Sequence, residues 1–571
     1  MIAVKLADEN SKDIKMMKKN ILISVCSHFS FLLFCVNAYA QSGATSLNKH
    51  PHNWWQADWK KDSIPGISLD KAYNYLKGRK SKPVIVAIID NCVDTAHEEL
   101  KDYIWTNKKE IPGNGIDDDD NGYVDDVHGW CYIANNKNVV QMKEASLDVI
   151  IYQSGKKEFQ NIDTSKLTGT SKMQFEMYQR AKLKIADRLE RFQQAGIVLK
   201  DSTKFIHYLD NLVSQYHAER LDKIPFFKLP FSNAYDSVAN QLFAKIVKYY
   251  STSINNLDSS IKYIPAFLHD HFYVDIIGFY GVEKNDTNFN SRNIMGDDPD
   301  NFNDKNYGTP FINLPEIGGK HATFLAGIIC ANRNNNSGMK GIADNVLLMP
   351  LITGSPGGVS MTKDIVLAIH YAVDNGASII NMSMGANRMP NIKELENAFE
   401  YARLNNVLIV TAGGNDGIDL DKEQWFFGQD STGHLPDNII RVSATRGLLS
   451  DSLVCNFSNF GKNKIEIFAP GSTIYSTLPG NKYSILEGTS IACPMVTGVA
   501  AILKSYFPSL TAKKIKEIIM KSVYKPDIMV IPPSHAGFTN KIPFSKLSKS
   551  GGIVNAYNAV KLSDEMIKKS K

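Results

Sequence analysis

The chain has 571 residues, of which 43% are hydrophobic and 22% charged, and its formal net charge at pH 7 is +5. This length and composition suffice for one large domain with insertions, and the absence of repeats or low-complexity tracts excludes solenoid and linker-array architectures. Lysine and arginine are scattered along the chain, so nothing indicates nucleic acid or an acidic membrane surface as a partner.

The first 40 residues predict a signal peptide. Lys18 and Lys19 precede an apolar run over residues 21–36, and Ala38-Tyr39-Ala40 fits a cleavage site. The alternative is a retained membrane anchor, but the run is short for a span and ends in a cleavage signal. We therefore expect export to the periplasm, the cell surface or the medium, with no stable membrane insertion after cleavage.

Five cysteines remain after the predicted cleavage. An odd number without CxxC spacing describes neither a disulfide framework nor a zinc site, although up to two pairs could form. We expect small buried apolar side chains. These cysteines are Cys92, Cys131, Cys330, Cys455 and Cys493.

A continuous apolar run over residues 83–90 ends in Asp90. Such a run is typical of a parallel strand that is buried on both faces. Ligands of open α/β sheets gather at the carboxyl ends of the strands, so Asp90 lies where chemistry is expected. An acidic residue that merely ends a strand at a turn fits equally well.

The same pattern recurs at residues 377–383 and 407–412, and helical stretches cover residues 363–375 and 391–404. Strands that alternate with helices predict an α/β fold, a doubly wound, mostly parallel sheet with helices on both faces.

Two helix starts carry a histidine and a serine. His321 heads a helix of small and apolar residues, and Ser490 lies between the turn residue Gly488 and the apolar run 496–503. Taken singly, the histidine would more often be a surface or capping residue and the serine an N-cap.

Asp90, His321 and Ser490, taken together, appear in the chain order known from subtilisin. With its flanking motifs, the chain resembles the subtilisin-like serine proteases, the subtilases, over residues 81–133 and 293–562. The motifs are Ala87-Ile88-Ile89-Asp90, His321-Ala322-Thr323 with Ala326-Gly327, Asn381-Met382-Ser383-Met384-Gly385, Ala412-Gly413-Gly414-Asn415, and Gly488-Thr489-Ser490 with Ala492 and Pro494.

The resemblance implies a catalytic role for four residues. Ser490 would be the nucleophile, His321 its base and later the acid, Asp90 the group that orients His321, and Asn415 an oxyanion donor. It also implies substrate binding along an edge and a pocket wall, formed by Ser383, Met384, Gly385, Ala412, Gly413 and Gly414. The small residues of the wall predict an open pocket for a large apolar side chain.

Two cysteines lie close in sequence to these residues. Cys493 is one helical turn from Ser490, and Cys92 is two residues from Asp90. Either would confer sensitivity to thiol reagents if its side chain faced the cleft; the alternative is a small buried filler.

An acidic segment after Asp90 fits part of an EF-hand-type loop. The predicted calcium ligands are Asp117, Asp119, Asn121, Tyr123 and Asp125. His128 stands at the twelfth position, where the usual glutamate is missing, so a structural Ca²⁺ site and a solvated acidic turn both fit. No cofactor is expected for the chemistry itself.

The predicted organisation places a large helical insertion inside the catalytic domain. Helical stripes such as Tyr178, Ala181 and Ile185 indicate either an internal core or a subdomain that guides substrates beside the cleft. The segments are 1–40 signal peptide (with Met16 or Met17 as alternative starts), 41–80 extension, 81–133 and 293–562 catalytic domain, 134–292 insertion and 563–571 tail.

The sequence thus predicts an exported serine endopeptidase that acts on polypeptide substrates. The alternative is a catalytically silent subtilase-like protein that binds peptides; that function would be indicated by loss of a catalytic residue, and none is lost. A lipase or esterase would require a G-x-S-x-G elbow and a different order of the three residues. The oligomeric state is not predicted.

Overall fold

A computed structural model describes fifteen stretches or single positions of the chain. The predicted signal peptide, residues 41–52 of the extension and much of the insertion lie outside them. The described residues are 53–135, 137, 139–140, 147–199, 202–215, 236, 239–240, 292–314, 319–335, 338–354, 360–385, 389–422, 427, 435–533 and 540–569.

A seven-stranded sheet forms the centre of the described domain, with the strand order β2-β3-β1-β4-β5-β6-β7. Every neighbouring pair in it is parallel. The strands are β1 (Val84–Asp90), β2 (Trp130–Cys131), β3 (Val346–Ile352), β4 (Ile379–Met382), β5 (Leu408–Ala412), β6 (Ile439–Thr445) and β7 (Ile467–Pro470). Because all strands run the same way, their carboxyl ends lie at one edge of the sheet.

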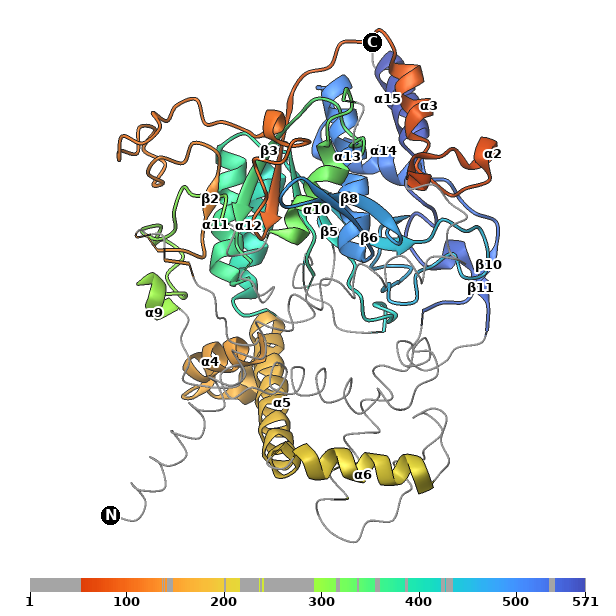
Figure 1. Cartoon of the computed structure of the whole chain (residues 1–571). Helices are drawn as coiled ribbons and strands as arrows, with labels where there is room; N and C mark the ends of the chain where they lie inside the picture. The colour runs from red at the N-terminus through yellow and green to blue at the C-terminus, as the bar shows by residue number, and fades with distance from the viewer. Residues whose placement is uncertain are drawn as a thin grey trace, which may run out of the picture. The chain divides into compact units, whose positions relative to one another are not determined.

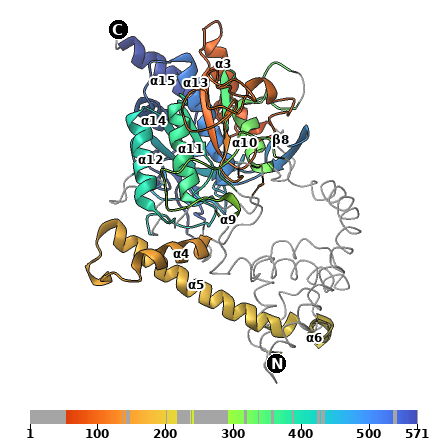
Figure 2. The same cartoon turned by 90° about the vertical axis from the view of Figure 1, so that its left-hand side faces the viewer.

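Helices cover both faces of this sheet (Figures 1 and 2). On one face α10 (Lys320–Cys330) and α13 (Thr489–Tyr506) pack against each other and against β1. On the other face, Ala87 and Ile89 of β1 share a buried cluster with residues of α11 (Thr362–Asp374) and α12 (Ile392–Leu404). The predicted fold class is confirmed.

Smaller elements surround this core. They are α2 (Trp59–Asp62), α3 (Leu69–Leu76), α9 (Arg292–Met295), α14 (Ala512–Lys521), α15 (Ala556–Lys569), the antiparallel pair β8 (Ile474–Leu478) and β9 (Lys482–Leu486), the antiparallel pair β10 (Met529–Val530) and β11 (Ile542–Pro543), and the short 3₁₀ turns η1 (Trp54–Gln56), η2 (Lys101–Tyr103) and η9 (Phe544–Lys546). A further 3₁₀ turn, η3 (Thr164–Lys166), lies within the insertion. Among the described helices, none is long and apolar enough to span a membrane.

The described part of the insertion is helical. It contains α4 (Leu147–Phe159), α5 (Gly169–Leu199) and α6 (Ser202–Gln215). Two residues of the predicted stripe, Ala181 and Ile185, are buried in contact with residues of α4. Ala181 also belongs to a cluster with Ile392, so the α4–α5 pair packs on the first residue of α12. These two positions of the stripe therefore belong to an internal core, the first of the two predicted alternatives.

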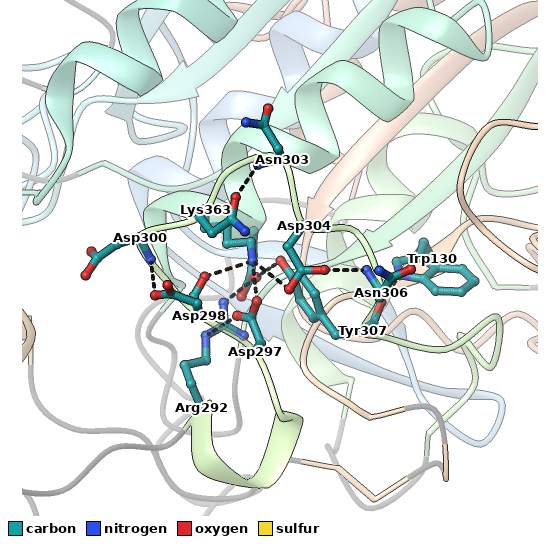
Figure 3. A network of polar contacts seen from close by, with 12 residues as sticks. Trp130, Arg292, Asp297, Asp298, Asp300, Asn303, Asp304, Asn306, Tyr307 and Lys363 are labelled. Atoms are coloured by element: carbon teal, nitrogen blue, oxygen red, sulfur yellow. Dashed lines mark hydrogen bonds and ion pairs between the residues drawn. The ribbon is translucent and has the colours of Figure 1, made fainter.

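A buried ion network holds the segment that follows the insertion against α11 (Figure 3). Arg292 pairs with Asp297 and Asp364, and Lys363 pairs with Asp297, while the Tyr307 hydroxyl donates to Asp364 at 2.7 Å. All four charged side chains are at least 99% buried. Two cations balance two anions, which is what makes such burial tolerable.

Lys363→Met should lower the free energy of unfolding by about 3–5 kcal/mol, because it leaves the buried Asp297 carboxylate without one of its two cations. Urea denaturation measures this change. Lys157→Met is the matched control: it breaks an ion pair with Asp300 in which the lysine side chain is 68% exposed. The control should change stability by about 1 kcal/mol or less. Equal effects of the two variants would contradict the importance of the buried network.

Candidate active site

Asp90 is fixed at the carboxyl end of β1. Its backbone carbonyl accepts hydrogen bonds from the N–H groups of Thr353 (2.9 Å) and Gly354 (3.1 Å), which follow the neighbouring strand β3. Its side chain is largely buried, and Oδ1 accepts the backbone N–H of Asn91 at 2.8 Å. The carboxylate is therefore oriented by the strand ends around it.

His321 lies in the first turn of α10 and faces Asp90. Its Nδ1 is 2.9 Å from Asp90 Oδ1 and 3.0 Å from Oδ2. A carboxylate only accepts, so Nδ1 carries the proton and Nε2 is left as the basic atom of the neutral ring. The side chain of Asn91 fixes the helix start by accepting the N–H of Ala322 at 3.0 Å.

Gly319 allows this close approach of the helix to the strand end. Its φ is +33°, and a Cβ there would lie 2.7 Å from the backbone oxygen of Cys92. A larger residue would push α10 away from the segment that follows Asp90.

Two opposing effects set the pKa of His321. Burial disfavours the charged imidazolium and lowers the pKa, whereas the charge of Asp90 and its hydrogen bond favour the imidazolium. The net direction is upward from the ordinary value, so the Asp90 contribution exceeds the effect of burial.

Ser490 lies in the first turn of α13, after Gly488. The Cα of Gly488 borders a space that Ser490 and Asn415 share: a Cβ built there would lie 3.1 Å from Ser490 Oγ, 3.7 Å from Ser490 N and 3.6 Å from Asn415 Nδ2. A hydroxyl, a backbone nitrogen and an amide nitrogen thus surround one small space that only glycine leaves open.

The orientation of the Asn415 amide is set by Thr489. Asn415 Oδ1 accepts both the backbone N–H and the hydroxyl of Thr489, each at 2.9 Å. A backbone N–H can only donate, so the oxygen must face Thr489 and the Nδ2 donor must point elsewhere. The Thr489 hydroxyl also accepts the N–H of Gly414 at 3.1 Å.

The end of β4 contacts the first turn of α13. The Ser383 hydroxyl donates to the backbone oxygen of Ser490 at 2.9 Å, and Asn381 Nδ2 donates to Ser383 Oγ at 3.0 Å. The carbonyl of Met384 accepts from the Thr411 hydroxyl at 2.6 Å, which ties this edge to β5. The predicted substrate-binding edge 383–385 therefore lies beside Ser490.

The predicted pocket wall follows β5. The carbonyl of Gly413 accepts from Asn459 Nδ2, and that of Gly414 accepts from the backbone N–H of Asn459, both at 3.0 Å. A Cβ on Gly413 would meet Ile465 and Ser443 at 3.0 Å, so the segment is packed closely from behind. Asn459 thereby holds the wall that begins at Ala412.

The two cysteines near the site are buried. Burial raises the pKa of the Cys493 thiol to about 12, and its Sγ points towards Asn381 Oδ1 and the Val410 carbonyl. Cys92 Sγ lies 2.9 Å from the Ile312 carbonyl. Both cysteines are thus small buried side chains, as the second of the two alternatives predicted. Cys493 stays a protonated, unreactive thiol at neutral pH.

The acidic loop distributes its side chains differently from the predicted ligand set. Asp117 accepts the backbone N–H groups of Asn121 and Gly122, and Asp125 accepts those of residues 113–115. Asn121 donates to Asp126, and the Tyr123 ring lies in the core. Of the five predicted ligands, only Asp119 belongs to the acidic cluster that the described residues form, together with Glu110 and Asp126.

Several residues that support the site were not predicted from the sequence. Asn91 positions His321, Thr489 positions Asn415, Asn381 positions Ser383, and Asn459 positions the pocket wall. A signal existed for three of them, because Asn91, Thr489 and Asn381 adjoin or lie within the motifs around the predicted site. Asn459 lies in a stretch without such a signal.

The comparison with known proteins settles the class of protein that this fold and site define. The model of the subtilase family matches residues 81–550, so the chain belongs to the subtilase family. This confirms the family that the sequence motifs predict.

Individual relatives are similar over shorter stretches. A thermophilic serine proteinase of Bacillus sp. (strain AK1) is 33% identical over 225 residues, which are 39% of this chain and 50% of the relative. Subtilisin DY of Bacillus licheniformis is 33% identical over 199 residues, 35% of this chain and 68% of the relative. The chain thus spans about half to two thirds of these proteins. The structure of the self-cleaved protease domain of PatA is 27% identical and covers 43% of this chain and 83% of that chain, with a TM-score of 0.34.

Under the catalytic roles that the subtilase motifs predict, Asp90→Asn should lower kcat of peptide hydrolysis by about 10⁴, because the amide no longer enforces the tautomer with a basic Nε2. The pH profile of kcat/KM gives a second measurement. With Asp90 present, the pKa of His321 is raised, so activity should increase with pH through a value above the ordinary 6.5 or so. In the variant the remaining effect of burial should move this acid limb to lower pH.

Asp102→Asn is the control, since it removes an exposed carboxylate from the same region of the chain. Its rate and pH profile should match those of the unsubstituted protein. An acid limb that stays at the same pH in Asp90→Asn would show that Asp90 does not set the protonation of His321.

Proposed function

We propose that this protein is a serine endopeptidase in which Asp90, His321 and Ser490 form the catalytic triad and Asn415 completes the oxyanion hole. The observation that carries the proposal is the shared space beside Gly488, bordered by Ser490 Oγ, Ser490 N and Asn415 Nδ2. The hydrogen bonds from His321 Nδ1 to Asp90 support it, because they leave Nε2 as a base.

The proposed reaction begins with the attack of Ser490 Oγ on the carbonyl carbon of the scissile peptide bond. His321 Nε2 takes the hydroxyl proton, and Asp90 stabilises the imidazolium that forms. The carbonyl oxygen becomes an oxyanion in the space beside Gly488, where Asn415 Nδ2 and the N–H of Ser490 donate to it.

The intermediate then collapses. The C–N bond breaks, His321 returns the proton to the leaving amine, and the acyl group remains on Ser490. A water molecule, deprotonated by His321, attacks the acyl carbon and releases the second product with regeneration of the serine hydroxyl. Two positioned donors stabilise the charge at each addition step.

We propose polypeptides as the substrates, bound in extended form along residues 383–385. Backbone groups of this edge would pair with the substrate chain, as in other cases of strand addition. The wall of residues 412–414 has small side chains, which supports a preference for a large apolar residue before the scissile bond. Export remains a proposal that rests on the signal-peptide pattern of residues 1–40.

Labelling with a fluorophosphonate probe tests the assignment of Ser490. The purified protein should take up one label per chain, at Ser490, because only a serine that is deprotonated by a neighbouring base attacks the phosphorus at a useful rate. Ser490→Ala should take up none and should not hydrolyse casein.

Another serine provides a matched control, and Ser472→Ala removes a hydroxyl that donates to the Glu487 carboxylate. This variant should label normally. Absence of label on correctly folded protein would indicate the catalytically silent peptide-binding alternative, and equal label on Ser490→Ala would place the nucleophile elsewhere.

A further inference from the structure

A cavity of about 340 Å³ lies between the insertion and the catalytic domain. One wall is α4 of the insertion, and the opposite wall consists of residues 361–363 at the start of α11 and residues 390–391 at the start of α12. Pockets that hold small ligands have volumes of about 300–1,000 Å³. The cavity is therefore large enough for one side chain or a small molecule.

Two apolar contacts hold the walls of this cavity together. Ile150 of α4 belongs to a buried cluster on which Met361 packs. Ile151, the next residue of α4, belongs to a second cluster together with Ile392, the first residue of α12. Because each contact joins α4 to the start of a helix of the catalytic domain, the distance between the two walls is fixed by core packing.

Several polar side chains of the lining have no hydrogen-bond or ion-pair partner among the residues that the structure describes. They are Tyr152, Ser154, Lys156 and Asn391. All of them but Lys156 are partly buried. A few unpaired polar groups that converge on a cavity with apolar walls are typical of a ligand site, because the ligand supplies the missing partners.

The charge of the lining favours an anionic ligand. The lining includes Lys156, Lys157 and Lys363 but only one acidic residue, Asp300. Lys157 pairs with Asp300 at 2.7 Å, and Lys363 pairs with Asp297, which is not part of the lining (Figure 3). Among the residues of the cavity, Lys156 is therefore the cation whose charge is left for a ligand.

The cavity lies within reach of the proposed nucleophile. The Ser383 hydroxyl is 2.9 Å from the backbone oxygen of Ser490, and Pro390 of the cavity wall follows Ser383 on the same connection between β4 and α12. The chain between these two residues spans at most about 25 Å. A substrate that extends from residues 383–385 covers this distance with about eight residues.

We propose that this cavity binds an aspartate or glutamate side chain of the polypeptide substrate, several residues away from the scissile bond; the inference rests on the proposed function. The carboxylate would pair with Lys156 and accept hydrogen bonds from the hydroxyls of Tyr152 and Ser154. The methylene groups of the substrate side chain would contact Ile150 and Met361. The insertion would thus select substrates through α4, in addition to forming a core with α5.

Peptide binding to the full chain carrying Ser490→Ala tests the cavity, because this variant cannot cleave the peptides. Each peptide has a central phenylalanine with about eight residues on either side, one of which is glutamate, and a matched peptide has glutamine there. Fluorescence anisotropy measures the dissociation constants. At one position the glutamate peptide should bind about fivefold more tightly than its glutamine counterpart, as expected for a partly exposed ion pair. About 0.5 M NaCl should reduce this difference.

Lys156→Met in the same background should abolish the difference between glutamate and glutamine peptides. Lys166→Met is the matched control and should keep the difference, since this lysine of the insertion is 82% exposed and does not line the cavity. A difference that survives in Lys156→Met would overturn the proposal. Equal binding of the two peptides at every position would also overturn it, as would a preference for glutamate at all positions alike, which indicates a general affinity for carboxylates.

Fluorophosphonate labelling of the unsubstituted protein separates this inference from the proposed function. A protein that takes up the label at Ser490 but shows no preference for glutamate would contradict the inference about the cavity alone. A protein that shows the preference but takes up no label would contradict the catalytic assignment alone.

Discussion

The hydrogen bonds between His321 and Asp90 are the interaction on which the proposed active site depends. The two residues are 231 positions apart, yet the parallel sheet brings them within 3 Å because Asp90 ends β1 and α10 packs against that strand. This one contact both fixes the tautomer of the imidazole and raises the pKa of His321. A long insertion between the two residues is tolerated because both are held by the core rather than by the chain between them.

A second constraint aligns α13 with the strand ends. Asn381, at β4, accepts from Thr497 at 2.8 Å and donates to Ser383, which in turn donates to the Ser490 carbonyl. These polar groups are buried and paired, so they specify one orientation of the helix, which an apolar contact alone would not do. Thr489 positions Asn415 in the same way, through hydrogen bonds. The reactive groups are thus few, and most of the polar residues around them position other residues.

The sequence predicted the parts of the fold whose strands are plain apolar runs, such as β1, β4 and β5. It did not predict β3 and β6, because Pro350 lies within β3 and Arg441 within β6, two residue types that argue against a central strand. Arg441 is tolerated because its guanidinium donates to the carbonyls of Lys464 and Phe427. Asp90, His321, Ser490 and Asn415 could be named from motifs. Glu110 could not, since its contribution to the acidic cluster depends on how the loop folds back.

Pre-steady-state kinetics with a p-nitrophenyl ester of an acylated amino acid test the central claim most directly. The protein should release a burst of nitrophenol equal to one equivalent per chain, and mass spectrometry of the quenched sample should place the acyl group on Ser490. His321→Ala should show no burst, because nothing else takes the serine proton. A burst that survives in His321→Ala, or an acyl group on another residue, would contradict the assignment of Asp90, His321 and Ser490 as one catalytic unit.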